Sequence, residues 1–433
     1  MIHGKPHIGE LIRELRDIKM MSQEAVAQAA YISRSSLSQI ELGIAGCPDS
    51  LLLAIKTGMG LENLPLLDTE RAAFRDKLYR WHDIINERKL DEAKELREQL
   101  SVIQLLRRDT ELNTLFSMFD CKLLLGLDEL EAAKKILNKF KVDGLSDMQL
   151  YHYYYNQGTY NIKCKHNQDA LDFYLKAYEL VTRGLEKNIT LYYNIAIAYS
   201  RLGFIAKATT FLEEAYSLHL AGHENDNVSE FDIYNLLGVF YAAIGVLQRG
   251  KYFLDKAHTI AINHFNSKET DGTKTNLGLV LLNYGILFRM GRKGDEAIEH
   301  FNKAHKYFSI GNVHYLETLY QKIRTMIEMN NPFPCPTLIT EGIKLSKNNE
   351  IYTLMFETLR VLANPDDEST RHVENETLPY LHENKFVRLA LDYAKFLRDY
   401  YKRKGERFKT RAFKMSDTVC TIMDLIYEGG VII

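Results

Sequence analysis

The stretch LYYNIAIAYSRLGFIAKATTFLEEAY, residues 191–216, places small residues where two antiparallel helices would have to approach each other closely. Ala196 precedes Ala208 by twelve residues, and Ala215 follows Ala208 by seven. The larger Leu212 comes four residues after Ala208, where it would fill the space between the two helices. The spacing therefore predicts a helical hairpin.

The same pattern occurs four times between residues 151 and 304. The small residues that mark the second helix of each copy are Ala170, Ala208, Gly250 and Ala297. Twelve positions upstream of each is another small residue, and these are Gly158, Ala196, Gly238 and Gly285. The pattern resembles the tetratricopeptide repeat, although the copies are 38, 42 and 47 residues apart and the family period is about 34. The resemblance implies an all-α fold in which a right-handed α-solenoid of helical hairpins forms most of the chain.

Two weaker copies precede the four strong ones. Leu90–Ala93 and Leu130–Ala133 resemble the start of the second helix in each of these early hairpins. Trp81, the only tryptophan, falls in the first of them, where a core or interdomain packing role is expected. Leu64–Thr69 is the expected linker to the preceding domain, because Pro65 would end a helix there.

Residues 8–64 predict an N-terminal domain of five short helices. Ser22 and Ser33 are suitable N-caps for the second and third helices, and Gly43 would end the third. The fourth and fifth helices are expected at residues 49–56 and 61–64.

The central part of this domain reads SQEAVAQAAYISRSSLSQIELG, residues 22–43. It resembles the helix-turn-helix of the phage-repressor and Cro-like superfamily, in which the second of the two central helices lies in the DNA major groove. By position, the residues expected to read bases are Arg34, Ser35 and Gln39. Those expected to contact phosphates are Gln23, Ser33 and Ser38. Arginine can bond bidentately to guanine and glutamine to adenine, which suits these roles.

An ordinary solvated helix face is the alternative interpretation of these polar residues. Residues 1–66 contain six Lys or Arg and seven Asp or Glu, a net charge of −1. Because neutralisation of phosphates supplies most non-specific affinity, one such domain should bind DNA weakly. Tight binding would require two copies on paired half-sites of a double-stranded operator, and hence a dimer.

Each strong repeat carries an asparagine in its first helix: Asn156, Asn194, Asn235 and Asn283. Helix propensity does not explain four asparagines at matching sites, which face the concave side in the superhelix of the resembled family. A side-chain amide can bond the N–H and C=O of an extended peptide without reading its side chains. The alternative is that these asparagines bridge one hairpin to the next.

Three cationic residues follow these asparagines by six or seven positions, and they are Lys163, Arg201 and Arg289. On or near the same face, they could hold the carboxylate of a peptide's C-terminus or of an acidic side chain. With the asparagines they complete the predicted peptide site.

The C-terminal part of the chain departs from the repeat pattern. Residues 364–377 are polar and acidic enough to predict a loop. Residues 385–414 contain eleven Lys or Arg and three acidic residues. A solvated helix face is expected for this basic segment, and pairing with the acidic loop or with DNA phosphates is the alternative.

Composition and motifs argue against several classes of protein. The net charge of −2 does not favour nucleic acid or membrane as a partner of the whole chain, and five scattered cysteines indicate a reduced, cytoplasmic protein. No signal peptide is evident and no apolar run approaches 18 residues. No nucleophile elbow, phosphate-binding glycine loop or metal-spaced histidine pair occurs, so neither catalysis, a cofactor nor a metal is expected. Four histidines are expected on helix surfaces or in the groove: His152, His258, His300 and His305.

A helix-turn-helix joined to such an array resembles the peptide-sensing quorum regulators of Gram-positive bacteria, the family that includes NprR, PlcR, PrgX and Rap, with a layout closest to NprR. The resemblance implies a DNA-binding domain at 1–66 and a peptide-binding and dimerisation domain at 67–433. It also implies a cytoplasmic transcriptional regulator, a homodimer or higher homo-oligomer, whose DNA binding is controlled by a short signalling peptide in the concave groove. Rap-like members act instead by binding a response-regulator protein. A scaffold that holds another protein's tail is a third alternative.

Overall fold

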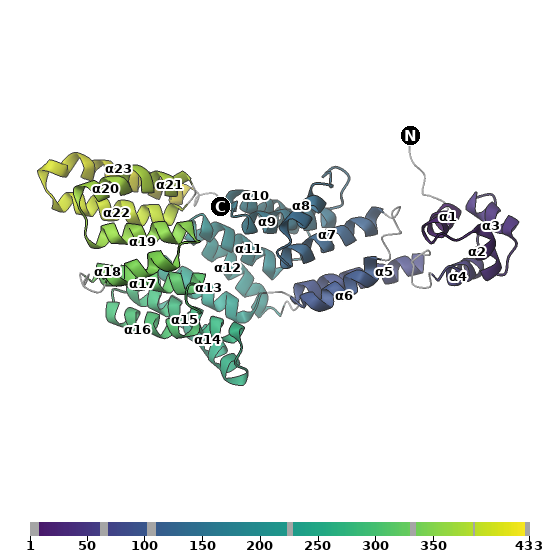
Figure 1. Cartoon of the computed structure of the whole chain (residues 1–433), viewed down its shortest axis with the longest axis horizontal. Coiled ribbons are helices and arrows are strands. Elements are labelled where there is room, and N and C mark those ends of the chain that lie inside the picture. Colours follow the sequence, from purple (N-terminus) through teal and green to yellow (C-terminus); the bar gives the residue numbers. More distant parts are fainter. Residues whose placement is uncertain are drawn as a thin grey trace. The chain divides into compact units, whose positions relative to one another are not determined.

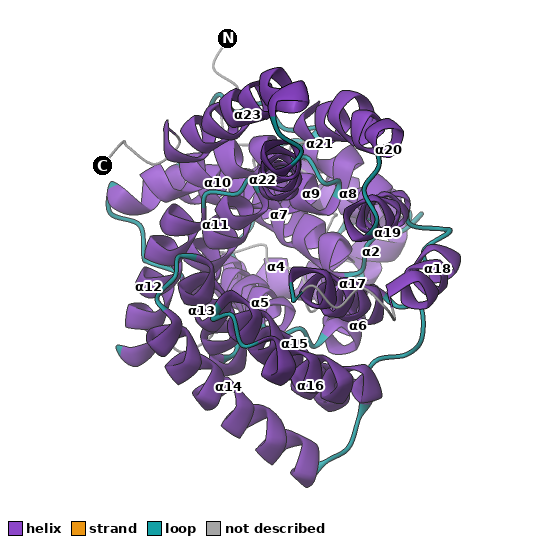
Figure 2. Cartoon of the chain, turned by 90° about the vertical axis from the view of Figure 1, so that its left-hand side faces the viewer, coloured by secondary structure: helices purple, strands orange, loops and turns teal. Residues whose placement is uncertain are grey.

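The computed structural model describes residues 8–60, 68–101, 110–222, 228–329, 335–383 and 386–428. In these ranges every regular element is a helix, as Figure 2 shows, which confirms the predicted all-α class. The chain divides into two compact units. One contains residues 1–164 and 176–185, and the other contains residues 165–175 and 186–433. The predicted boundary between residues 66 and 67 lies outside the described residues and stays a prediction.

The N-terminal helices of the first unit are α1 (Ile8–Ile18), α2 (Gln23–Ala29), α3 (Arg34–Glu41) and α4 (Asp49–Gly58). Both predicted caps are confirmed: Ser22 Oγ accepts from the Ala25 N–H at 3.1 Å, and Ser33 Oγ accepts from the Ser36 N–H at 3.0 Å. The apolar side chains between these helices are buried: Ile12, Leu15, Val26, Leu37, Ile40, Leu52 and Ile55. The predicted fifth helix, residues 61–64, lies outside the described residues.

The remaining helices of the first unit are α5 (Asp68–Asn86), α6 (Leu90–Ser101), α7 (Thr110–Gly126), α8 (Leu130–Leu137) and α9 (Asp147–Lys163). α6 and α8 are the second helices of early hairpins, as predicted. Trp81 has the expected core role, because its side chain is fully buried, stacks on Phe116 at 5.2 Å between ring centroids and donates Nε1–H to the Ala93 carbonyl at 2.9 Å. α10 (Asn167–Thr182) contributes residues to both units.

The second unit continues the hairpins with α11 (Ile189–Arg201), α12 (Ile205–Leu220), α13 (Glu230–Ala243), α14 (Leu247–Ser267), α15 (Asp271–Met290), α16 (Gly294–Ala304), the 3₁₀ turn η2 (His305–Tyr307), α17 (Val313–Glu328), α18 (Cys335–Leu345) and α19 (Glu350–Ala363). Within hairpins, α11 packs on α12, α13 on α14 and α15 on α16 (Figure 1). Between hairpins, the first helices α13, α15, α17 and α19 lie side by side in that order (Figure 2). One face of these helices therefore forms a continuous wall.

Small residues permit the close approach that the sequence predicts. A Cβ atom added at Gly285 would lie 2.3 Å from the Phe301 ring, and one added at Gly238 would lie 2.5 Å from Leu254 Cγ. Ala208 is fully buried against the partner helix of its own hairpin. The size of these side chains therefore sets the distance between the helices of each hairpin.

The loop predicted at residues 364–377 is wrong, because this segment is mostly helical. It contains α20 (Asp367–His372) and the π-helix η3 (Val373–Thr377), and α21 (Leu378–Glu383) follows directly. Asp366 caps α20 by accepting from the Glu368 and Ser369 N–H groups at 2.9 and 2.8 Å. Burial of Val373 and Thr377 stabilises the helix against the polar composition of the segment.

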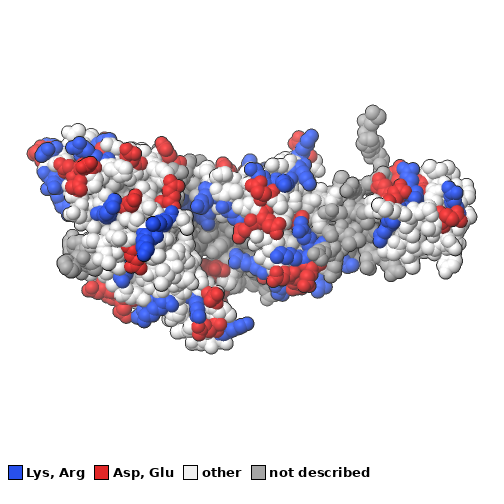
Figure 3. Space-filling model, in the orientation of Figure 1, with Lys and Arg blue, Asp and Glu red and all other residues white. Residues whose placement is uncertain are grey.

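The basic segment ends the chain as α22 (Val387–Arg403), the 3₁₀ turn η4 (Glu406–Phe408) and α23 (Lys409–Glu428). The cations around the junction of α22 and α23 are exposed, which confirms the solvated face: Lys402, Arg403, Lys404, Arg407 and Lys409. Acidic and basic side chains are interspersed on the face that Figure 3 shows. Lys414 also pairs at 2.8 Å with the buried Glu374 of η3, so the predicted pairing with the acidic segment exists at one residue.

Candidate functional site

Helix α3 presents the predicted base-reading residues to solvent. Arg34, Ser35 and Gln39 are exposed, and Ser33 is exposed as the N-cap of the same helix. Ser38 is half-buried. A short helix with its N-terminal polar side chains accessible is the geometry that enters a major groove.

A buried carboxylate fixes the first three helices together, and sequence reasoning missed it. Glu41 of α3 is 1% exposed and accepts from Arg16 of α1 through Nε at 2.8 Å and Nη2 at 3.1 Å. The hydrogen bond to Glu41 raises the pKa of Arg16. Gln23, predicted to contact phosphate, donates to the same carboxylate at 2.8 Å. Its side chain therefore holds α2 against α3 in this structure.

The four asparagines do not have equivalent surroundings. Asn156 is 1% exposed and donates from Nδ2 to the Met118 carbonyl of α7 at 2.8 Å. This bond bridges α9 to the preceding hairpin, which is the alternative that the sequence left open. Lys163, at the end of α9, forms an ion pair with Asp128. Both residues thus have a structural partner within the first unit.

Asn235 and Asn283 lie together on the wall of the second unit. Asn283 Nδ2 donates to Asn235 Oδ1 at 2.7 Å, which joins α15 to α13. Asn235 is 8% exposed and Asn283 is half-buried. This bond uses one N–H of Asn283 and the side-chain oxygen of Asn235. It does not use the side-chain N–H₂ of Asn235 or the side-chain oxygen of Asn283. The two groups have the complementarity needed for one peptide unit of a bound strand.

Asn194 and Arg201 lie on α11, two turns apart. Asn194 is half-buried. Arg201 is exposed, yet desolvation by the surrounding protein lowers its pKa. An accessible guanidinium on the same helix as Asn194 can pair with a carboxylate.

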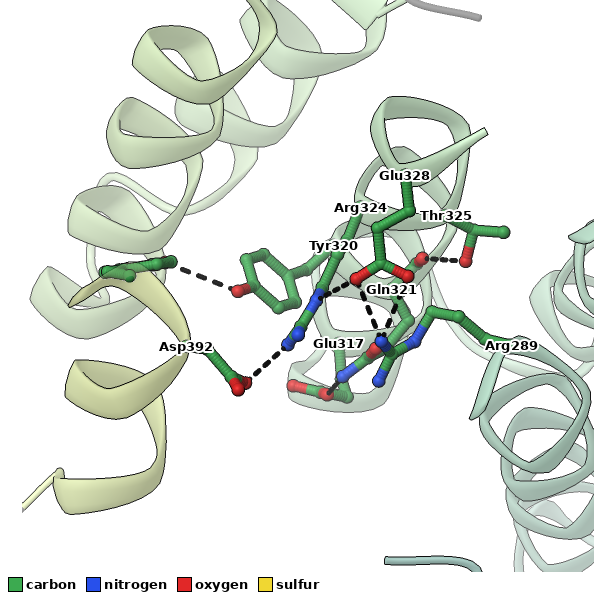
Figure 4. A network of polar contacts seen from close by, with 9 residues as sticks. Arg289, Glu317, Tyr320, Gln321, Arg324, Thr325, Glu328 and Asp392 are labelled. Carbon is green, nitrogen blue, oxygen red and sulfur yellow. Dashed lines mark hydrogen bonds and ion pairs between the residues drawn. The ribbon is translucent and has the colours of Figure 1, made fainter. Parts of the chain in front are cut away.

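Arg289 belongs to a polar network that the sequence did not reveal (Figure 4). Its Nη1 lies 3.1 Å from Glu328 Oε1, and Arg324 Nε lies 2.9 Å from the same oxygen. Arg324 Nη1 in turn reaches Asp392 of α22 at 2.9 Å. Desolvation and the neighbouring Arg324 lower the pKa of Arg289, while Glu328 opposes this shift. The sequence feature that could have indicated this network is a polar stripe on α17. Its residues are spaced by four, three and four positions: Glu317, Gln321, Arg324 and Glu328.

The prediction that His152 lies on a surface or in the groove is wrong. Its ring is 5% exposed and packs edge-on against Phe119 and His82, with centroids 5.0 and 5.1 Å away. Burial lowers the pKa of His152 to about 3. This histidine is therefore a neutral core residue of the first unit.

The exposed α3 and the repeat wall define a class of protein, a helix-turn-helix domain joined to a helical-repeat domain with polar side chains on its first helices. Residues 12–54 match the helix-turn-helix family model. The chain is 26% identical over 404 residues to the transcriptional activator NprA of Geobacillus stearothermophilus, which covers 89% of this chain and 96% of that protein.

Two solved structures share the repeat fold. The apo form of the quorum sensor NprR from B. thuringiensis matches with a TM-score of 0.64 at 20% identity. The match covers 82% of this chain and 100% of the NprR chain. A Rap protein complexed with competence and sporulation factor matches with a TM-score of 0.67 at 16% identity. The match covers 82% of this chain and 99% of the Rap chain. The family model and the NprA relative confirm the predicted helix-turn-helix and the likeness to a transcriptional activator, and the two structures confirm the predicted repeat fold. No helix within the described ranges is long and apolar enough to cross a bilayer.

Proposed function

We infer that this chain is a transcriptional regulator whose α3 binds operator DNA and whose repeat wall binds a short signalling peptide. The observation that carries this inference is the combination, in one chain, of an accessible recognition helix and a paired-amide site. Arg34 and Gln39 supply donors for base edges, and Asn235 with Asn283 supplies a donor and an acceptor for a peptide main chain.

The proposed peptide contacts are Asn194, Arg201, Asn235, Asn283 and Arg289. Asn156 and Lys163 are not included, because they belong to the first unit, where they contact Met118 and Asp128, whereas the five proposed contacts belong to the second. NprR has also been solved in complex with its cognate peptide NprX, and it shares the fold of this chain at a TM-score of 0.64. That likeness supports a peptide as the ligand class, and the amide pair supports main-chain recognition.

The proposed coupling is a selection between curvatures of the repeat array. Each hairpin contacts its neighbours, so a ligand that touches several first helices favours one arrangement of them. To convert a mostly inactive population into a mostly active one, the peptide must bind one arrangement about 10⁴-fold more tightly. Several amide and guanidinium contacts together have the strength for such a difference.

Selection of operators from a random duplex library with the purified chain tests the DNA half of the proposal. The expected result is enrichment of paired half-sites, because a domain with a net charge near zero needs two copies for tight binding. A protein that acts only by contact with a response regulator would enrich no sequence. Arg34→Ala is the matched control and should remove preference at one position of each half-site.

A further inference from the structure

Helix α17 carries a charged cluster that joins three helices (Figure 4). Arg289 comes from the last turn of α15, Arg324 and Glu328 from α17, and Asp392 from α22. Arg324 is bonded to Glu328 at 2.9 Å and to Asp392 at 2.9 Å. The cluster therefore contains two guanidinium groups and two carboxylates.

Glu328 is the most exposed member of this cluster, since the side chains of Arg324 and Asp392 are 20% and 21% exposed. Its side chain is 44% exposed, whereas that of Arg289 is 9% exposed. Both Arg289 and Arg324 bond to the same oxygen of Glu328, at 3.1 and 2.9 Å. Without this carboxylate, two largely desolvated guanidinium groups would face each other with only Asp392 as a counterion, which is costly. An anion is thus required where Glu328 lies.

Two polar atoms of Arg289 and Gln321, the latter on the same helix as Glu328, have unused hydrogen-bonding capacity. Among the described residues, Arg289 Nε and Gln321 Oε1 are buried and have no hydrogen-bond partner. One is a donor and the other an acceptor. Figure 4 draws Gln321 on the same helix as Glu328, with its amide Nε2 bonded to Glu317 at 2.7 Å. A ligand that brings a carboxylate together with an amide N–H would satisfy these atoms as well as the two guanidinium groups. The C-terminal residue of a peptide has this pair of groups.

We propose that Arg289 and Arg324 form a carboxylate-binding site that Glu328 occupies from within the protein, and that a ligand carboxylate with an adjacent amide N–H displaces Glu328. The identification of that ligand as the signalling peptide rests on the proposed function. The existence of the carboxylate site does not, because it depends only on the cluster itself.

Displacement would be transmitted through Arg324. This residue and Tyr320 on α17 bond to two consecutive residues of α22, through the ion pair with Asp392 and the 3.3 Å contact between the hydroxyl groups of Tyr320 and Tyr393. A ligand that replaces Glu328 changes the partners of Arg324, and with them the attachment of α22. The ligand site is therefore linked to the C-terminal helices.

Chemical rescue tests the site without knowledge of the peptide. In Glu328→Ala the vacated position should accept acetate, so the melting temperature in sodium acetate should exceed that in sodium chloride of equal ionic strength by about 2–4 °C. The wild-type chain should show no such difference, and neutral acetamide should have no effect. Arg289→Met combined with Glu328→Ala should abolish the acetate response.

Glu299→Ala is the matched control, because it removes an exposed ion pair with Lys303 at 2.6 Å on the neighbouring α16. It should show no acetate-specific stabilisation. Equal melting temperatures of Glu328→Ala in acetate and chloride, or the same gain in Glu299→Ala, would overturn the proposal. If Glu328→Ala does not fold, Glu328→Ser, which also vacates the position of the carboxylate, gives the same comparison in acetate and chloride. Failure of the proposed function would instead leave operator binding unaffected by peptides, so the two failures are distinguishable.

Discussion

The side-chain amide of Asn283 donates to the side-chain oxygen of Asn235 at 2.7 Å, across two successive hairpins of the repeat array. The bond orients both amides on the wall formed by α13 and α15. It serves the bridging role that the sequence offered as an alternative to ligand contact. Because each amide has a donor and an acceptor, the bridge leaves one of each for a ligand, and the two interpretations are compatible here.

The combined substitution Asn194→Ala and Asn235→Ala should abolish the response to peptide while the fold is retained. Loss of the amides removes main-chain contacts, and Asn283, being half-buried, can bond to water instead of Asn235. The measurement is calorimetry with the peptide fraction that activates the protein. Unchanged peptide affinity in the double variant would refute the assignment.

Asn156→Ala should behave in the opposite way. Its loss leaves the buried Met118 carbonyl without its side-chain donor, so the free energy of unfolding should fall by about 1–3 kcal/mol. Peptide affinity of the folded fraction should be unchanged. Urea unfolding followed by Trp81 fluorescence measures the loss, because this only tryptophan lies in the same unit. A stable variant with lost peptide affinity would show that Asn156 is a ligand contact after all.

Arg34→Ala should relax base preference at one operator position, with a discrimination loss of roughly 1–3 kcal/mol. The reason is that Arg34 is exposed at the start of α3, where a guanidinium can bond two acceptors of one guanine. Binding to a panel of single-base operator variants provides the measurement. Uniform weakening across all variants would make Arg34 a phosphate contact.

Gly285→Ala should destabilise the second unit by about 1–3 kcal/mol, because the added methyl group would collide with the buried Phe301 ring at 2.3 Å. Gly272→Ala in the same helix is the control, since its nearest neighbour would be 3.7 Å away. That substitution should be neutral or slightly stabilising, because alanine favours helix. Comparable losses in both variants would show that close approach of the helices is not the cause.

The first unit should lose stability as the pH falls below about 6.5, the ordinary pKa of histidine. Burial lowers the pKa of His152 to about 3, so the unfolded chain binds a proton in this range that the folded chain does not. Between pH 7.5 and 5.5 this single group should lower the free energy of unfolding by about 1 kcal/mol. His152→Gln should remove that part of the pH dependence, and identical pH profiles would contradict the assignment.

The repeat array could be predicted because close packing of its helices requires small residues at regular spacing, and that spacing is visible in the sequence. Ala208 and Gly285 mark the contacts between helices, and both positions are confirmed. The polar segment at 364–377 was misjudged because its composition suggests solvent, whereas burial of Val373 depends on a packing partner distant in sequence. Contacts between residues distant in sequence cannot be predicted from local sequence patterns.

In the candidate site, too, some residues could be predicted from local sequence patterns and others could not. The positions of Arg34 and Asn235 in a pattern predict them as site residues. The bond of Gln23 to Glu41 could not be predicted, because it joins residues 18 positions apart on different helices. The Arg324–Asp392 pair spans 68 positions and links helices of different hairpins. Only the folded chain brings these groups together.

The central claim is that a short peptide on the repeat wall controls DNA binding by α3. The most direct measurement is the fluorescence anisotropy of a labelled, selected operator titrated with the purified chain, with and without the low-molecular-weight peptide fraction of the native host's culture medium. The account predicts that this fraction shifts the binding curve by at least tenfold, and that the Asn194→Ala, Asn235→Ala double variant binds the operator but shows no shift. Superimposable curves for the wild-type chain with and without the peptide fraction would contradict it.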